Sequence, residues 1–290
     1  MGDGAKLFFR NRWTDATLGT ITSGGDVSAF PASNTQTNIP SEIWRAQNLS
    51  TAYLLRDLGA DFRIGGLCVH GHNLSSAGQI RGRIADNAAM TSPLYDSGLT
   101  NAWGAVFPVG SPFGDSSQRP NAEGRELLPL PVWRQTLSSE VYARHIRIDF
   151  SDPNNQARVI EADWCYAGLV HEASPTQAFG WQLIPVPESI IKLAQTGQEW
   201  IEGQRKFFRA IGTYEGQDEA AANFWTFLFN DVGLTKPFVI SMRDAQIIWQ
   251  AETTMLCRFT RDPFIEHQEN VAGDRISVYR IEVELEEVIG

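Results

Sequence analysis

The feature that most constrains this chain is a series of short runs in which polar and apolar residues alternate, separated by turn-forming clusters. Polar and apolar residues alternate from 145 to 150. In 80–84, the two arginines lie on one face of the predicted strand, and the two isoleucines lie on the other face with Gly82. The runs 62–69 and 158–169 are β-prone as well, the first of them following a turn around Gly59. Alternation with period 2 is typical of a strand that has one face in the core and one in water. The first two-thirds of the chain is therefore predicted to be mainly β.

The pattern changes after a polar, proline-containing stretch near 171–181, which is typical of a linker. We expect a first domain at 1–172, a linker at 173–181 and a second, smaller domain at 182–290. The net charge of −10 and the pI of about 5.0 disfavour nucleic acid and anionic membrane surfaces as partners. No apolar run is long enough to cross a bilayer, and the first residues have no apolar core of a signal peptide. We therefore expect a soluble protein that is made in the cytoplasm.

The second domain is predicted to be α+β, with one helix over a sheet. Apolar residues recur at helical spacing in 218–232, and Gly233 is a good helix stop. We expect strands at 200–210, 237–242, 254–260 and 275–288. In the last strand, the glutamates at 282, 284 and 286 are interpreted as a solvated face whose charge discourages unwanted strand pairing.

The residue types that carry catalysis or bind metal do not form a convincing site. His70 and His72 share one face of an extended strand, but zinc needs three or four ligands, so hydrogen bonding to the backbone is the preferred interpretation. Cys68, Cys165 and Cys257 have no metal-binding spacing and are expected to be buried, reduced thiols. Nucleotide-binding and nucleophile motifs are absent from the sequence. We expect no cofactor, no metal and no enzymatic activity.

A long insertion, 88–137, separates the predicted strands of the first domain and is dense in Gly, Pro, Ser and Asn. Trp103, Phe107, Phe113 and Trp133 lie within it. Their rings either pack on their own domain or anchor a partner, because solvated aromatics would favour aggregation. We take these four residues as a candidate interface and hypothesise that the insertion is a docking arm that orders against a neighbouring subunit.

Two further candidate interface residues, Phe224 and Trp225, lie in the predicted helix of the second domain. That domain has much apolar sequence for its size, which favours an obligate assembly. Trp13 and Trp44 lie beside turns of the first domain, where exposed rings can stack on sugars and buried ones fill the core.

A set of segments in the first domain resembles the discoidin-like, galactose-binding-like jelly roll. The segments are Trp44-Arg45-Ala46, Asp57-Leu58-Gly59, Gly71-His72-Asn73-Leu74-Ser75 and Arg144-His145-Ile146-Arg147-Ile148. The turn at 71–75 is similar to minor tail and baseplate proteins of long-tailed bacteriophages. In the second domain, Phe224–Phe229, Lys236–Ser241 and Leu256–Thr260 resemble distal tail subunits. The sugar-binding residues of some discoidin-like domains match no motif here, so none is carried over.

The resemblance implies a mainly β chain with an N-terminal jelly-roll sandwich, and a structural role without catalysis. The expected function is that of a tail-tip or baseplate subunit in the virion tail, which would form a homo-oligomeric ring and bind other tail proteins. A carbohydrate-binding module that recognises host surface glycans is the alternative. A glycan-cleaving enzyme is a third, weaker option, because a glycosidase pair of carboxylates cannot be chosen without its spatial separation.

Overall fold

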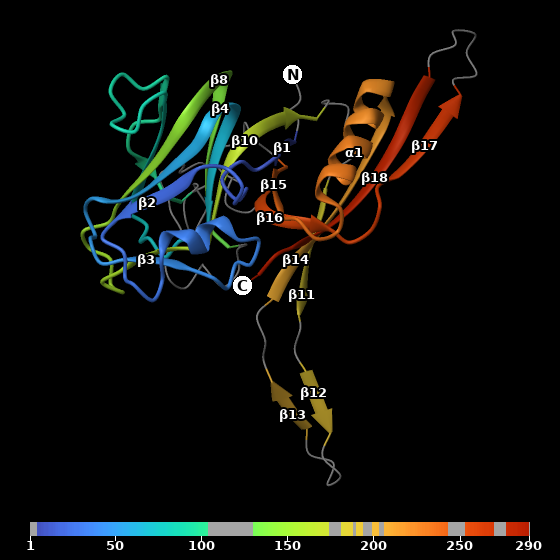
Figure 1. The fold of residues 1–290 in the computed structure, drawn as a ribbon. Coiled ribbons are helices and arrows are strands. Elements are labelled where there is room, and N and C mark those ends of the chain that lie inside the picture. The colour runs from blue at the N-terminus through green and yellow to red at the C-terminus, as the bar shows by residue number, and fades with distance from the viewer. Residues whose placement is uncertain are drawn as a thin grey trace, which may run out of the picture. The chain divides into compact units, whose positions relative to one another are not determined.

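The computed structural model divides the chain into two compact units, which are described separately (Figure 1). The described residues are 5–103, 130–173, 181–187, 190–193, 199–202, 206–242, 253–269 and 277–289. The first unit comprises 1–175 with 237–256 and residue 290, and the second comprises 176–236 and 257–289. The chain passes from the first unit to the second between 175 and 176. However, 237–256 belongs to the first unit, because β15 (Phe238–Ser241) pairs with β1 (Lys6–Phe9).

The first unit is built on two long antiparallel strands, β4 (Ala52–His70) and β8 (Val132–Ser151). The N-terminal half of β4 pairs with β2 (Thr20–Gly24), and its C-terminal half pairs with β10 (Trp164–Glu172). On the other side, β8 pairs with β5 (Gln79–Ala85). Two short strands, β6 (Tyr95–Asp96) and β7 (Thr100–Asn101), pair with β5.

A second layer covers the inner face of this sheet and completes the sandwich. It contains the pair β3 (Trp44–Ala46) and β9 (Ile160–Ala162), and the short helix η1 (Ala32–Gln36). The Trp44 ring lies 5.2 Å from the ring of Phe150 on β8. These residues belong to one continuous apolar core, so the mainly β sandwich expected for the first domain is confirmed.

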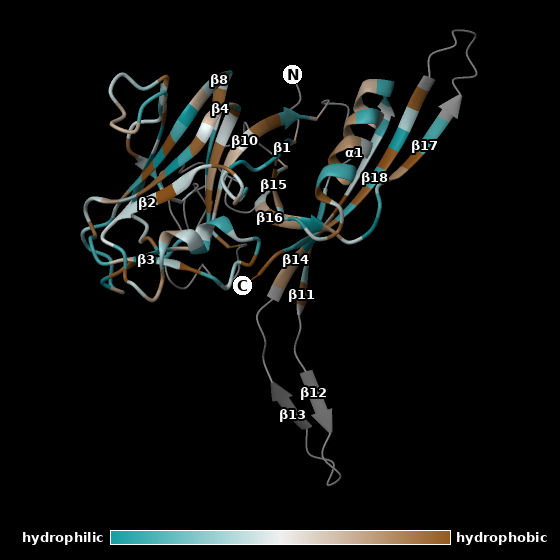
Figure 2. Ribbon diagram, viewed as in Figure 1, coloured by the Kyte–Doolittle hydropathy of each residue, from teal (hydrophilic) through white to brown (hydrophobic). Residues whose placement is uncertain are grey.

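The predicted alternation is present in β8 and β5. Ile146 and Ile148 are fully buried, whereas Arg147 and Asp149 are on the opposite face. Figure 2 shows that hydrophilic and hydrophobic residues alternate along the strands. Burial of the isoleucines fixes the register, because a slip by one residue would move every side chain to the wrong face.

Two boundaries differ from the sequence-based prediction. Gly59 does not end a strand: it lies within β4, with φ +76°, where the pairing with β8 shifts register. Only a residue that tolerates the left-handed region fits such a bulge without strain. The range 132–137, assigned to the insertion, is the start of β8, and its Trp133 and Leu137 are buried. The turn-rich composition of the preceding segment concealed this strand.

The second unit has one helix on an antiparallel sheet, as predicted. The sheet contains β11 (Gln182–Pro187), β14 (Lys206–Gln217), β18 (Ser277–Glu287) and β17 (Phe264–Glu269), with the end of β16 (Thr254–Phe259). A separate hairpin joins β12 (Ile190–Leu193) to β13 (Glu199–Glu202), so the predicted single strand at 200–210 is corrected to parts of β13 and β14. The polar, glycine-containing run at 202–206 was the sign of that interruption.

The helix α1 (Glu219–Val232) packs through Trp225, whose ring lies 5.3 Å from Tyr214 and 6.5 Å from Phe259. Among the described residues no helix is long and apolar enough to span a membrane. The side chain of Asp218 caps the helix by accepting a hydrogen bond from the Ala221 N–H at 2.8 Å. Gly233 ends it with φ +57°.

The glutamates of β18 form the partly exposed face that was predicted, but this face is not at a sheet edge. β18 pairs with strands on both sides and is not an edge. Glu284 contacts Arg209 and Arg261, and Glu286 contacts Arg258, so the charges match arginines on neighbouring chain segments. Removing β18 would therefore dismantle the sheet of the second unit.

We expect Asp218→Ala to lower the unfolding free energy by about 1 kcal/mol, because the helix loses its N-terminal cap. Asp231→Ala is the matched control: it also removes one carboxylate, but from the last turn of α1, where a negative charge is unfavourable. Urea denaturation followed by Trp fluorescence measures both. Equal loss of stability in the two variants would contradict the capping role.

Candidate functional site

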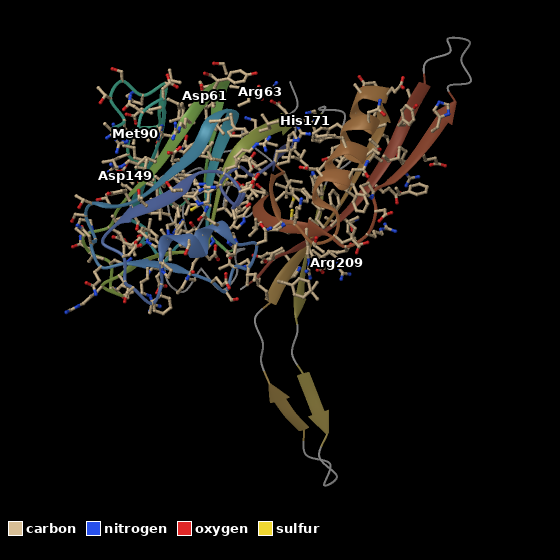
Figure 3. All side chains as sticks on the ribbon, viewed as in Figure 1. Asp61, Arg63, Met90, Asp149, His171 and Arg209 are labelled. Atoms are coloured by element: carbon tan, nitrogen blue, oxygen red, sulfur yellow. The ribbon has the colours of Figure 1, made fainter. Side chains whose placement is uncertain are left out.

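The outer face of the first unit's sheet carries a row of charged side chains on neighbouring strands. Arg81 pairs in register with Asp149, and Asp149 pairs with Tyr53. In the adjacent row, Arg83 lies beside Arg147. Because the alternate residues of these strands fill the core, this face is fixed by the same register that buries the isoleucines. Figure 3 labels Asp149 on this face.

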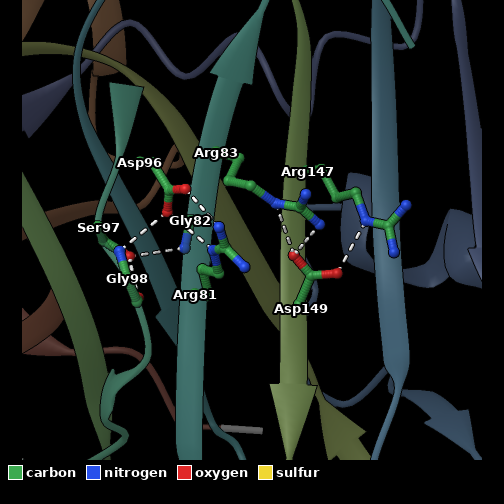
Figure 4. A network of polar contacts seen from close by, with 8 residues as sticks. All are labelled: Arg81, Gly82, Arg83, Asp96, Ser97, Gly98, Arg147 and Asp149. Carbon is green, nitrogen blue, oxygen red and sulfur yellow. Dashed lines mark hydrogen bonds and ion pairs between the residues drawn. The ribbon is translucent and has the colours of Figure 1, made fainter. Parts of the chain in front are cut away.

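The centre of the face is Asp149, whose carboxylate is shared by two arginines (Figure 4). Arg83 donates to Oδ2 of Asp149 through Nη2 at 2.7 Å and Nε at 3.1 Å. Arg147 donates to the other oxygen, Oδ1, through Nε at 2.8 Å. Charge-assisted bonds of this kind hold guanidinium planes in fixed orientations.

A second ion pair borders the first. Arg81 binds Asp96 side-on, with Nε 2.8 Å from Oδ1 and Nη2 in contact with Oδ2. Asp96 also accepts from the Gly98 N–H at 2.9 Å, and Ser97 Oγ accepts from the Gly82 N–H at 2.9 Å. The hydrogen bond from Arg81, and to a smaller extent that from Gly98, lowers the pKa of Asp96, and the Asp96 carboxylate raises the pKa of Arg81. The turn after β6 is thereby tied to β5.

The guanidinium group of Arg147 packs against an aromatic ring. Its guanidinium carbon lies 3.9 Å from the centroid of Tyr53, a cation–π arrangement. The ring in turn lies against Gly24 of β2, where an added Cβ would be 2.4 Å from Tyr53 Cε1. Any other residue at position 24 would displace the ring, so Gly24 allows the stack to form.

A third cluster lies further along the same sheet. Arg144 donates to both oxygens of Asp57, at 2.6 and 2.8 Å, and His145 Nε2 lies 3.7 Å from Asp57 Oδ2. The hydrogen bond from Arg144 is the main cause that lowers the pKa of Asp57 to about 2. We name the residues Tyr53, Arg81, Arg83, Asp96, Arg147 and Asp149 the arginine face.

The aromatic residues predicted as an interface are placed differently. Trp103 and Trp133 are 4% and 3% exposed and belong to the core of the sandwich. Trp103 Nε1 donates to the Leu74 carbonyl, and Trp133 Nε1 donates to Thr100 Oγ1, both at 2.8 Å. The prediction that these two rings anchor a partner is therefore wrong, because both rings and both N–H groups are used within their own unit.

Trp225 is also corrected, since it is 1% exposed and packs beneath α1. Phe224 is half-buried beside it, and its interface role stays a prediction. Phe107 and Phe113 lie outside the described residues, as does most of the proposed docking arm. Trp13 and Trp44 are fully buried, with their N–H groups bonded to Thr35 and Asp26.

The histidines hold the sandwich together. His72 Nε2 lies 3.1 Å from the Ala102 carbonyl, as the backbone interpretation predicted. His70 instead pairs with the buried Asp163, with 2.7 Å between Nδ1 and Oδ1. The described residues contain no group of three or more side chains suited to a metal ion. Cys68, Cys165 and Cys257 are buried and form no disulfide, as predicted, and burial raises the pKa of the Cys68 and Cys165 thiols.

Sequence reasoning missed the arginine face as a site. The signal was present, because Arg81, Arg83, Arg147 and Asp149 were all placed on the wet faces of predicted strands. What the sequence did not supply was the pairing of β5 with β8, which brings the two runs side by side.

We expect an NMR titration to give a midpoint near pH 2 for the Asp57 carboxyl group. A folded-state pKa below the usual value means that this carboxylate stabilises the fold above about pH 4. That contribution is lost as the pH falls from about 4 towards 2. In Arg144→Ala the midpoint should rise towards the ordinary value, whereas Arg63→Ala, which removes an arginine paired with Glu140, should leave it unchanged. An unchanged midpoint in Arg144→Ala would refute the assigned cause.

Comparisons with known proteins give only distant structural matches. No family model matches the chain, and no curated protein does. A family 32 carbohydrate-binding module from C. perfringens NanJ in complex with galactose has 12% identity and a TM-score of 0.35, over 52% of this chain and 93% of that chain. The lectin binding domain of lectinolysin complexed with Lewis b has 9% identity and a TM-score of 0.36, over 56% and 96%.

The family 32 module of AlyQ in complex with 4,5-unsaturated mannuronic acid has 18% identity and a TM-score of 0.33, over 56% of this chain and 96% of that chain. These structural neighbours are carbohydrate-binding and lectin modules, and the matches give no sign of a phage tail protein. At these TM-scores the likeness assigns neither a family nor a ligand to the chain.

Proposed function

We propose that the first unit is a glycan-binding module and that the arginine face is its binding surface. The observation that carries the proposal is the shared carboxylate of Asp149, which holds Arg83 and Arg147 on a rigid sheet. Sugar hydroxyls both donate and accept hydrogen bonds, whereas a guanidinium only donates and a carboxylate only accepts. A face that presents both groups at fixed positions suits neighbouring hydroxyls on a sugar ring.

The rigidity of the face supports the proposal. Side chains that are already ordered lose little conformational entropy when a ligand binds. Arg147 is ordered by the Asp149 carboxylate and by the Tyr53 ring, and Arg81 by both oxygens of Asp96. These groups remain accessible, with side-chain exposures of 26% for Arg147 and 37% for Arg81. The proposal names the same ligand class as the structural neighbours, but it rests on this geometry alone.

Arg83→Ala should weaken glycan binding by the full chain roughly tenfold, because it removes one of the two guanidiniums held by Asp149. Arg63→Ala is the matched control. Arg63 lies on β4 and is also ion-paired, with Glu140, but it lies outside the arginine face. A glycan array identifies the ligand, and calorimetric titration then compares the variants. Failure of the unaltered chain to bind any glycan would refute the proposal, as would equal affinity of the two variants.

A second candidate function is assembly into a larger particle, of the tail-tip kind that the sequence resembles. It is favoured by apolar side chains on the second unit's surface. Phe227 on α1 is 38% exposed and Leu234, one residue beyond the helix stop, is 45% exposed. Both residues belong to the second unit, one on the helix and one in the turn that follows it. Both functions are compatible, because they use different units.

If the helix forms a subunit contact, Phe227→Ser should reduce oligomers of the purified chain in favour of monomers. The matched control is Leu99→Ser, which replaces an exposed apolar residue of the first unit. Mass photometry at several concentrations measures the distribution. A chain that is monomeric at every concentration, alone and with tail proteins, would argue against assembly.

A further inference from the structure

The arginine face carries more positive charge than its own carboxylates neutralise. Arg81 is matched by Asp96, but Arg83 and Arg147 share Asp149. Three guanidiniums against two carboxylates leave one positive charge, in a chain whose net charge is −10. An excess of positive charge at this one place favours an anionic ligand there.

The excess is concentrated on Arg147. Its Nε is bonded to Asp149, which leaves the two terminal Nη groups. Neither has a hydrogen-bond partner among the residues that the structure describes. Figure 4 shows the terminal nitrogens of Arg147 turned away from Asp149, on the side towards β4. Such a pair of Nη groups, on a side chain that is 26% exposed, is the fork with which arginine binds a carboxylate through two parallel hydrogen bonds.

The surroundings of Arg147 suit one end of a sugar. In its register row it lies beside Leu55, and Leu55 lies beside Thr22 of β2. Thr22 is exposed and its hydroxyl can donate or accept, whereas Leu55 is half-buried and brings no opposing charge. The register row thus places a polar residue on each side of Arg147: Arg83 next to it, and Thr22 two strands away.

We propose that the ligand is an acidic glycan, and that Arg147 binds the carboxylate of a carboxylated sugar end-on. This rests on the proposed function of the arginine face and adds the class of sugar and the residue that selects it. Asp149 and Tyr53 act as positioning residues, since they hold the guanidinium plane and leave its two Nη groups for the ligand.

The test is an array on which each carboxylated glycan is printed beside its methyl ester, together with sulfated glycans of the same backbone. The full chain should bind the acid at least about tenfold more tightly than the ester, because the ester lacks the charge and one acceptor oxygen. Esterification leaves the rest of the sugar unchanged, so the difference reports on the carboxylate alone.

Two variants test whether Arg147 causes the preference for the acid over the ester. Arg147→Ala should bind acid and ester equally. Arg147→Lys, which keeps the charge but loses the fork, should retain only a small part of the preference. Arg63→Ala should behave as the unaltered chain does, and circular dichroism melting confirms that each variant is folded.

The outcomes separate this inference from the proposed function. Binding of acid and ester with equal affinity overturns the acidic-glycan inference and leaves a glycan-binding module standing. Binding confined to sulfated glycans overturns the assignment to a carboxylate, and an undiminished preference in Arg147→Ala overturns the role of that residue. No binding to any glycan refutes both proposals.

Discussion

The antiparallel pairing of β4 with β8 is the constraint on which the first unit depends. Both strands are much longer than an average strand, and together they supply nearly half of the buried residues of the sandwich core. Strands from distant parts of the chain add to their edges: β2 and β10 to β4, and β5 to β8. Their inner residues bury the apolar layer, and their outer residues present the arginine face. Hydrophobic burial is therefore what positions the charged side chains, since it fixes which residues point outwards.

Several polar groups inside the sandwich find partners within the unit. Trp103 and Trp133 each find an acceptor within the unit, and His70 finds Asp163. Gly71 is required next to this pair, because its φ is +60° and an added Cβ would be 1.8 Å from Asp163 Oδ2. Unpaired buried polar groups are costly, so these bonds favour one arrangement of the loops around the core.

The elements with a clear period were predictable from the sequence, and the pairings between them were not. The alternation at 145–150 and the helix at 218–232 are local properties, and both are present in the structure. The bulge at Gly59 and the start of β8 at Val132 depend on which strand lies opposite, which local composition does not encode. The same reason explains why the burial of two tryptophans was not predicted. Trp103 and Trp133 lie in or beside a turn-rich segment, yet the core that takes them up is formed by residues far away in sequence.

The candidate site was hidden for a related reason, because Arg83 and Arg147 are far apart in the chain and meet only across the β5–β8 pair. This origin has an evolutionary consequence. A site carried on loops changes its ligand readily through insertions and deletions, which loops tolerate. A site on the outer faces of paired strands cannot change in that way, because an inserted residue would turn Ile146 and Ile148 towards water. Its specificity can drift only by exchange of one outward side chain for another. Related chains with very different loops would thus keep the same spacing of positions on this face, and differ in the residues that occupy them.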